Sequence, residues 1–498
     1  MDALRTDFLT RKKIFGLSGL IMLAALAWIF VSCGKSSSSG GTQMGTAVLS
    51  ISDPPSCAVP NGSFKSVFVT IRSVQANLSA TADDNSSGWQ ELAPQLNNQP
   101  MQVDLLNLPQ NGSCLLQQLG STTSLPVGDY QQIRLLLVAN SASATTVPVT
   151  NACASLGHVY NCVVDSKNNI SALQLSSQAN TGLKIPPGQV VGGPIRVTAG
   201  QSVDINVDFN ACASIVDEGN GQFRLKPTLT AGEISPNTSG ISGQVVDSAT
   251  TAPIAGAKAA LEQADSTGTE HIFMEASADA NGNFRFCPLP TGSMFDVVVD
   301  ALNGAGVAYN ATVLLHVPAG TAIGSLPILA ETGTPPGGPA ILQGTVTAVN
   351  GTIGANVDVS LAALQSISVS GSGNMEIVTP LLSTSQQRST ETAAVQSSTP
   401  CQGNTPTGAF CAQYTLVVPA SNPSVGAFVS GTTTKFAAPA TGDVLYSLEA
   451  QASQPMSGGV AMCSPASHTM ALDNTGQTLK ASAGATSSVH EVDFSACQ

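Results

Sequence analysis

Residues 203–209 read Val203-Asp204-Ile205-Asn206-Val207-Asp208-Phe209, and apolar and polar side chains alternate along them. Successive side chains of a β-strand point to opposite faces, so this period of two predicts a strand with one buried face. Residues 64–74 and 414–418 also carry strand-like patterns. Turn residues separate such segments along the chain, which indicates antiparallel sheets. The sequence therefore predicts an all-β protein of three tandem antiparallel β-sandwich domains.

Candidate helices and long loops are few. The best amphipathic helix is residues 257–263, which are too few to form a helix that is stable alone. A stretch rich in Ser, Thr and Gln, residues 383–399, is predicted to be a long loop. Neither segment alters the all-β prediction.

The composition excludes several classes of protein. The chain has 498 residues, of which 10% are charged and 4% aromatic, and its formal net charge is −13. A mean hydropathy of +0.18 with so little charge argues against intrinsic disorder. The acidic balance disfavours nucleic acid as a partner, because phosphate neutralisation needs clustered Lys and Arg.

The first 33 residues have the pattern of an export signal. Four basic residues lie within the first 13, and a charge-free apolar run follows at residues 14–32. The segment Phe30-Val31-Ser32-Cys33 then resembles the bacterial lipobox, in which the cysteine is acylated and becomes the mature N-terminus. The resemblance implies that residues 1–32 are removed and that Cys33 carries the lipid.

A lipid anchor at Cys33 would determine where the protein resides. Residues 33–44 would form a Ser- and Gly-rich tether, and several acyl chains would hold it stably at about 0.8 kcal/mol per buried methylene. The alternative is that residues 14–32 span a bilayer uncleaved. Cleavage changes the net charge from −13 to −15, because residues 1–32 carry four basic and two acidic side chains. We expect an exported protein anchored to the cell envelope, on the outer membrane, whose only membrane contact is the anchor.

Ten further cysteines indicate an oxidising compartment. None belongs to a Cys-x-x-Cys pair, so a zinc ribbon or a thioredoxin-type motif is not supported. The candidate disulfides are two that close short loops and one that is the default of the last region: Cys153–Cys162, Cys401–Cys411 and Cys463–Cys497.

The other four cysteines leave two alternatives open. Cys57, Cys114 and Cys212 form an odd set in the first part of the chain, and Cys287 stands alone in the middle. Either one of the three early cysteines bonds to Cys287, or two thiols stay free. Spacing alone does not determine the connectivity.

Two segments rich in Pro, Gly and Ser divide the exported chain. They lie at residues 233–240 and 331–339, and domain boundaries fall in segments of this kind. The sequence therefore predicts units at residues 45–234, 240–330 and 340–498.

One internal repeat links the first and last units. Residues 207–212 read Val-Asp-Phe-Asn-Ala-Cys, and residues 492–497 read Val-Asp-Phe-Ser-Ala-Cys. A shared way of ending a strand is one explanation, and a duplicated domain is the other.

The first unit resembles a known family. The segments that carry the resemblance include Leu49-Ser50-Ile51-Ser52-Asp53-Pro54-Pro55, Trp89-Gln90-Glu91-Leu92, Val103-Asp104-Leu105-Leu106 and Phe223-Arg224-Leu225-Lys226-Pro227. In this order they resemble domain of unknown function family 4382, a family of uncharacterised bacterial lipoproteins. The resemblance implies neither an activity nor site residues.

The middle unit contains Ile241-Ser242-Gly243-Gln244-Val245-Val246-Asp247 and Asn281-Gly282-Asn283-Phe284-Arg285-Phe286. It resembles the carboxypeptidase regulatory-like domain, a small transthyretin-type β-sandwich with a carbohydrate-binding-like fold. Asn281-Gly282 can supply the positive φ of a tight hairpin, after which Phe284 and Phe286 point to one face. The resemblance implies a fold and no particular ligand. Residues 340–498 resemble no family and are predicted to form a third β-sandwich.

Motifs for catalysis are missing from the sequence. It contains no His-Glu-x-x-His helix, no Gly-x-Ser-x-Gly elbow and no phosphate-binding loop, and its five histidines are scattered singly. We therefore expect no enzyme, no cofactor and no resident metal.

Two groups of acidic residues are candidate cation sites. Residues 279–283 match the start of a calcium loop, but Pro290 stands where a bidentate Glu is required, so a hairpin is favoured. Asp53, Asp104, Asp129 and Asp208 could together hold a cation, although turn and strand-end roles explain each one.

Two aromatic residues are candidates for stacking on a ligand. Trp89 and Tyr130 could bind a sugar, but Trp89 is the only Trp after residue 32 and suits a core position. The sequence predicts a non-enzymatic, lipid-anchored envelope protein for binding, adhesion or scaffolding. The alternative is a carbohydrate-binding surface lipoprotein, whose partner would be a glycan; an envelope protein is the other candidate partner.

Overall fold

The computed structural model describes most of the chain after residue 42. The described residues are 43–53, 63–82, 85–111, 114–175, 182–185, 190–191, 193–219, 221–226, 229–234, 240–264, 270–290, 292–302, 308–331, 338–350, 357–369, 373–379, 390–395, 401, 409–431, 434–456 and 459–497. The predicted export signal, Cys33 and nearly all of the tether lie outside them. Within the described ranges no helix has the length and apolarity needed to cross a bilayer.

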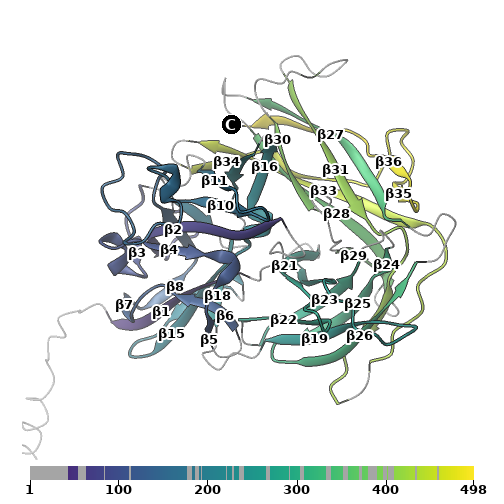
Figure 1. Cartoon of the computed structure of the whole chain (residues 1–498), viewed down its shortest axis with the longest axis horizontal. Helices are drawn as coiled ribbons and strands as arrows, with labels where there is room; N and C mark the ends of the chain where they lie inside the picture. Colours follow the sequence, from purple (N-terminus) through teal and green to yellow (C-terminus); the bar gives the residue numbers. More distant parts are fainter. Residues whose placement is uncertain are drawn as a thin grey trace, which may run out of the picture. The chain divides into compact units, whose positions relative to one another are not determined.

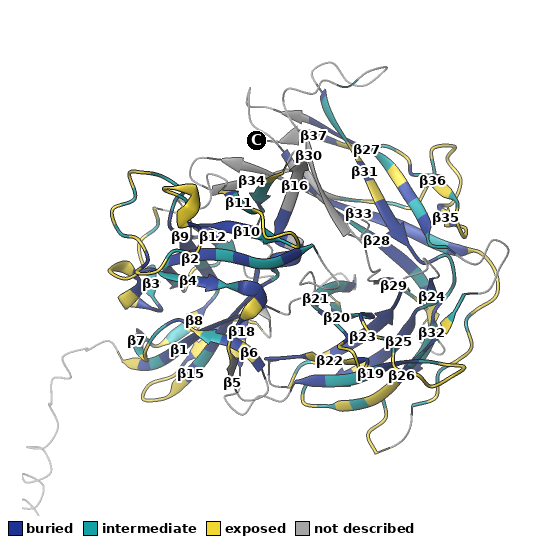
Figure 2. Cartoon of the chain, in the orientation of Figure 1, coloured by how far each residue is buried: buried dark blue, intermediate teal, exposed yellow. Residues whose placement is uncertain are grey.

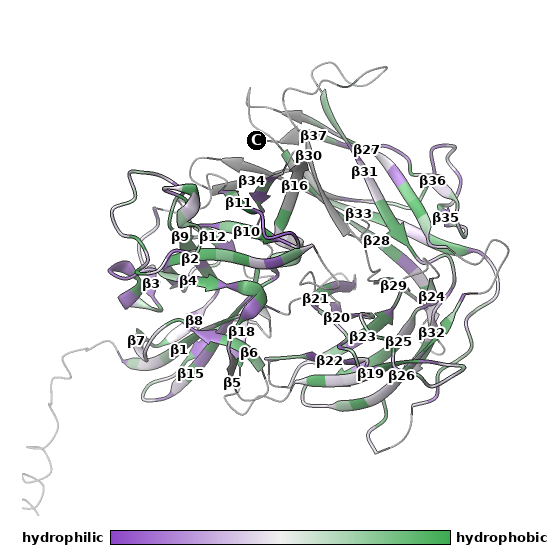
Figure 3. Ribbon diagram, in the orientation of Figure 1, coloured by the Kyte–Doolittle hydropathy of each residue, from purple (hydrophilic) through white to green (hydrophobic). Residues whose placement is uncertain are grey.

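Strands make up nearly all of the regular structure, which confirms the all-β prediction (Figure 1). The helices described are single turns: η1 (Pro94–Asn97), η2 (Leu105–Asn107), η3 (Ala154–Leu156) and α3 (Ala211–Ser214). Buried residues run along the strands, and exposed residues gather in the connecting segments (Figure 2). Hydrophobic and hydrophilic residues share most strands, as half-buried strands require (Figure 3).

The first unit has two large sheets around one apolar core. The seven-stranded sheet has the order β13 (Val190–Val191), β18 (Leu229–Ile234), β15 (Ser202–Phe209), β1 (Met44–Ser52), β6 (Cys114–Gln118) and β5 (Gln110–Asn111), with β7 (Thr123–Pro126) also paired to β1. The nine-stranded sheet has the order β12 (Leu183–Ile185), β9 (Gln132–Leu137), β2 (Phe64–Asn77), β10 (Cys162–Asp165), β11 (Ile170–Leu175), β17 (Gln222–Leu225) and β16 (Ile215–Gly219), with β3 (Gln90–Glu91) and β4 (Met101–Asp104) on β2. A small third sheet pairs β14 (Ile195–Val197) with β8 (Gly128–Tyr130).

The middle unit is a sandwich of two sheets. One has the order β22 (Asn283–Phe286), β19 (Ile241–Asp247), β26 (Ala322–Ala330) and β24 (Tyr309–Asn310). The other has the order β21 (Glu270–Ser277), β20 (Lys258–Ala264), β23 (Met294–Asp300), β25 (Thr312–Pro318) and β32 (Ser424–Ala427). Phe284 and Phe286 are both buried in the core between these sheets, which confirms that they share a face.

The third unit is built from one ten-stranded sheet. Its order is β29 (Gly373–Val378), β28 (Val357–Val369), β33 (Val444–Met456), β34 (Gly459–Met470), β37 (Val492–Cys497), β27 (Ala340–Asn350) and β31 (Ala409–Val418), with β30 (Thr390–Val395), β35 (Lys480–Ala481) and β36 (Thr486–Ser488) paired to β28, β33 and β27. Buried side chains of β27 and β28 meet in one core although three strands separate them in the sheet, so the sheet curls over its own core.

One local prediction was wrong, that of a long loop over residues 383–399, and two further segments differ from what their local sequence suggests. Residues 257–263 overlap strand β20 and form no helix, because β20 pairs with β21 on one side and β23 on the other. Residues 383–399 are not one loop, because strand β30 lies within them and pairs with β28. Strand β32, from the predicted third unit, pairs in parallel with β25 and completes a sheet of the middle unit.

The repeated Val-Asp-Phe segments occupy matching places. Asp208 of β15 lies opposite Ser52 of β1, and Asp493 of β37 lies opposite Thr347 of β27, each in a parallel pair with the strand that opens its unit. In both pairs the hydroxyl donates a hydrogen bond to the carboxyl group. A duplicated domain would give this arrangement, whereas a shared strand ending does not require the same partner strand.

Candidate functional site

A cavity of about 650 Å³ lies between the first and middle units. Asp53, Cys114 and Leu115 of the first unit form one wall. Residues of strands β19, β21, β22 and β26 of the middle unit, together with Asp279 and Cys287, form the other. Its volume is within the range typical of small-molecule sites.

The wall from the middle unit is a polar sheet face. Gln244 of β19 lies between Asn283 of β22 and Ser325 of β26, and the neighbouring Ser242 pairs with Arg285. The Ser325 hydroxyl lies 3.4 Å from Gln244 Oε1, and Gln244 Nε2 donates to the carbonyl of residue 281 at 2.9 Å. Because side chains alternate along β22, Asn283 and Arg285 are exposed on one face while Phe284 and Phe286 are buried in the core on the other. Asn283, Phe284 and Arg285 all line the cavity.

A disulfide between Cys114 and Cys287 joins the two walls. The two cysteines are 173 positions apart, and their Cα atoms lie 5.2 Å apart. Of the two alternatives left by the sequence, the structure has the one in which an early cysteine bonds to Cys287. Cys212 is disulfide-bonded as well, and Cys57 lies outside the described residues.

Three pairs of cysteines were candidate disulfides in the sequence. Disulfides join Cys153 to Cys162 and Cys401 to Cys411. Residues 463 and 497 are register partners on β34 and β37, so their backbones face each other across the sheet.

Asp53 is the unusual residue of the cavity. It is 1% exposed, and its Oδ1 accepts a hydrogen bond from the N–H of Ala211 at 3.3 Å, whereas its Oδ2 has no partner among the described residues. Burial raises the pKa of this carboxyl well above its ordinary value, and the negative charge of Asp208 raises it further. The ionised form is disfavoured because burial removes the hydration of the carboxylate and the neighbouring acids repel its charge.

Asp208 is a second buried carboxyl next to Asp53. Burial raises its pKa to about 7, and the hydrogen bond from Ser52 Oγ, at 2.6 Å, lowers the pKa in part. Asn206 Nδ2 donates to the same Ser52 oxygen at 2.7 Å, while Asn206 Oδ1 has no partner in the described ranges. The parallel pairing of β1 with β15 brings these four polar side chains together.

The four predicted acids do not gather into one cation site. Asp104 accepts a hydrogen bond from the N–H of Leu106 and caps η2. Asp129 forms a surface ion pair with Arg196, with Nε and Oδ1 2.9 Å apart. Among the described residues, no group of three or more His, Cys, Asp or Glu side chains could hold a metal ion.

The calcium-like segment is a hydrogen-bonded turn. Asp279 Oδ1 accepts the N–H groups of Asn281 and Asn283, both at 2.8 Å. Gly282 has φ +74°, and a Cβ there would lie 2.5 Å from the carbonyl oxygen of Val245. The predicted hairpin was wrong, because the strands on either side of the turn belong to different sheets, and the turn carries the chain across the sandwich.

The two aromatic candidates lie apart from the cavity lining. Tyr130 is 1% exposed, and its hydroxyl donates to the carbonyl of Pro126 at 2.9 Å, so its ring has no face for a sugar. Trp89 is half-buried, and the Arg134 guanidinium lies 4.1 Å from its ring centroid. The contact with Arg134 has the geometry of a cation–π interaction.

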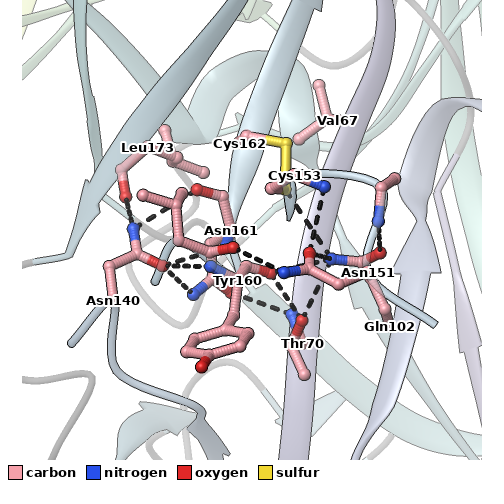
Figure 4. Close-up of a disulfide and its surroundings, with 12 residues drawn as sticks. Val67, Thr70, Gln102, Asn140, Asn151, Cys153, Tyr160, Asn161, Cys162 and Leu173 are labelled. Atoms are coloured by element: carbon pink, nitrogen blue, oxygen red, sulfur yellow. Dashed lines mark hydrogen bonds between the residues drawn. A yellow bond between two sulfur atoms is a disulfide. The ribbon is translucent and has the colours of Figure 1, made fainter. Parts of the chain in front are cut away.

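A second polar cluster surrounds the Cys153–Cys162 disulfide (Figure 4). Asn161 is fully buried; its Oδ1 accepts the N–H of Thr70, and its Nδ2 donates to Asn140. Dashed lines in Figure 4 connect these amides to the strand that carries Thr70. Because the amides bond to each other and to backbone groups, this cluster holds the loop before β10 against β2 and offers no open site.

Comparisons with known proteins agree with part of the predicted resemblance. Residues 44–227 match the model of a family described as Domain of unknown function (DUF4382). No curated protein matches the chain.

Among solved structures, the shaft pilin SpaA from Lactobacillus rhamnosus GG is 12% identical, with 58% of this chain and 97% of that chain covered and a TM-score of 0.16. A Streptococcal ancillary pilin is 10% identical, with 80% and 96% covered and a TM-score of 0.16. A putative adhesin from Bacteroides ovatus is 9% identical, with 52% and 94% covered and a TM-score of 0.15. TM-scores this low support no conclusion about this chain.

Proposed function

We propose that the protein is an exported, lipid-anchored, non-enzymatic protein of the cell envelope. In this proposal it binds a small ligand in the cavity between its first and middle units. The polar sheet face and the unpartnered carboxyl of Asp53 on one cavity are the observation that carries the binding role. The disulfides of the chain support export, because such bonds persist in oxidising compartments.

The domain organisation supports a binding role over a catalytic one. The two-sheet middle unit fits its resemblance to a carboxypeptidase regulatory-like domain, which we propose it is. The Cys114–Cys287 disulfide would fix one wall of the cavity against the other. This would reduce the conformational entropy that is lost when a ligand binds.

The binding role is tested by a thermal-shift screen of small molecules on the exported chain. A Ser325→Trp variant fills the cavity from an exposed position, and Ser248→Trp makes the same change on an exposed turn of the same unit. We expect compounds that stabilise the wild type and the Ser248 variant, and no stabilisation of the Ser325 variant. Compounds that stabilise all three proteins equally would show that the cavity is not the site.

The anchoring role is tested by replacing residues 1–33 with a signal that is cleaved without lipidation. We expect the wild type in the membrane fraction and the variant in the soluble fraction, because the anchor is the proposed membrane contact. A variant that stays with the membrane would contradict lipid anchoring as the cause of localisation.

A further inference from the structure

The cavity contains a polar atom that the fold leaves unsatisfied. Within the part of the chain that the structure describes, Asp53 Oδ2 has no hydrogen-bond partner, although the residue is buried and lines the cavity. Such an atom destabilises a folded protein, and buried polar groups are otherwise nearly always bonded. The oxygen itself has almost no accessible surface, so a molecule in the cavity supplies the missing partner by displacing the lining atoms that cover it.

Charge at this end of the cavity favours a positive partner. Asp208, Asp104 and Glu275 are the neighbouring charges that disfavour ionised Asp53. Arg285 also lines the cavity, but it lies on the exposed face of β22 as the register partner of Ser242. The surroundings of Asp53 are thus acidic, and a cation there would be attracted by several carboxyl groups at once.

We propose that the cavity binds an organic amine, whose protonated amino group donates a hydrogen bond to Asp53. This rests on the proposed binding function and names the class of ligand. An ammonium group has three donors and no acceptor, so it can bond to a carboxylate and to hydroxyl or amide oxygens together. Gln244 and Ser325 supply such oxygens on the facing wall. A metal ion fits less well, since the described residues contain no group of three acidic, His or Cys ligands.

Binding an ammonium ion should release a proton. Free Asp53 holds its proton because of burial and the acids Asp208, Asp104 and Glu275 around it, with only the Ala211 N–H opposing them. The bound ammonium stabilises the carboxylate, so the carboxyl proton leaves to solvent and the amine keeps its own. Affinity therefore rises with pH until the free Asp53 carboxyl has ionised.

The test is isothermal titration calorimetry of the exported chain with putrescine, spermidine and glucosamine. Each titration is run in phosphate and in Tris, whose different ionisation enthalpies report the protons released. We expect at least one amine to bind with release of about one proton per site. The Asp53→Asn variant should bind roughly 10- to 100-fold more weakly and release none, because a charge-assisted hydrogen bond is lost.

Asp129→Asn is the matched control, because it makes the same substitution of Asp by Asn at an exposed ion pair on the same unit. Its affinity should stay within about twofold of the wild type. If Asp53→Asn does not fold, Ser325→Trp should abolish amine binding by filling the cavity.

Three results would overturn the inference: no binding of any amine, binding without proton release, or binding that neither variant weakens. Binding of neutral sugars alone would favour the carbohydrate alternative. These outcomes leave the proposed function intact as long as the thermal-shift screen finds another ligand of the cavity, and that screen fails separately if the cavity binds nothing.

Discussion

Replacing Asn161 with alanine should destabilise the first unit by about 4 kcal/mol. The Asn161 side chain is fully buried, accepts the N–H of Thr70 at 2.8 Å and donates to the carbonyl of Val138 at 2.8 Å. Alanine leaves both backbone groups buried and unpaired, at about 1–3 kcal/mol each. Asn140 also loses one donor, but its Oδ1 keeps the backbone N–H groups of residues 160 and 161. This loss is a large share of the free energy of unfolding of a typical domain, which is about 5–15 kcal/mol.

Urea unfolding followed by Trp89 fluorescence measures this loss in the first unit alone. Trp89 is the only tryptophan after residue 32 and lies within that unit. With a slope of about 2 kcal/mol per molar urea, 4 kcal/mol lowers the midpoint by about 2 M. Asn169→Ala removes an exposed amide whose Nδ2 bonds to Asp165, and should shift the midpoint by less than about 0.3 M. An Asn161→Ala variant whose urea midpoint equals that of the Asn169→Ala control would refute the stabilising role given to the buried amide.

The remaining predictions concern the disulfide, the repeated strands and the buried acid. Replacing Cys114 and Cys287 with Ser should increase protease cleavage between the first and middle units, because the bond closes a loop of 173 positions and contributes about 5 kcal/mol in the loop-entropy model; unchanged cleavage would contradict this. Phe209→Ala and Phe494→Ala should each lower the stability of their own unit by about 3–5 kcal/mol in calorimetry, since both rings are fully buried; a small effect in one unit would argue against matching positions. The pKa of Asp208 is about 7 in the folded state, against an ordinary value of 3.8, so the folded state binds this proton more tightly than the unfolded state does. The stabilisation of the fold by this protonation is therefore full below pH 3.8 and is lost as the pH rises through about 7. Urea titrations across this range should show stability falling with pH in the wild type and a flatter profile in Asp208→Asn.

Local pattern was enough to predict several strands. The alternation of residues 203–209 corresponds to β15, Ser202–Phe209, because a strand with one buried face needs little more than period two. Residues 257–263 show the limit of this approach. Their Ala, Glu and Gln content favours a helix, but the two neighbouring strands supply hydrogen bonds on both sides and bury the apolar face.

The candidate site depended on contacts between distant segments. The sequence named Asp53 as one of four candidate acids and held nothing that distinguished it from the other three. Its burial follows from the pairing of β1 with β15, which lies about 155 positions away along the chain. The facing wall required the Cys114–Cys287 connection, which spacing left open. Strand β32 joined the middle unit for the same kind of reason, since β25 would otherwise lack a partner on that side.

Mass spectrometry of the N-terminal peptide from membrane-extracted protein tests the proposed anchoring most directly. We expect a chain that begins at Cys33 and carries acyl chains on that residue. A chain that begins at Cys33 without acyl groups, or that still contains residues 1–32, would contradict it.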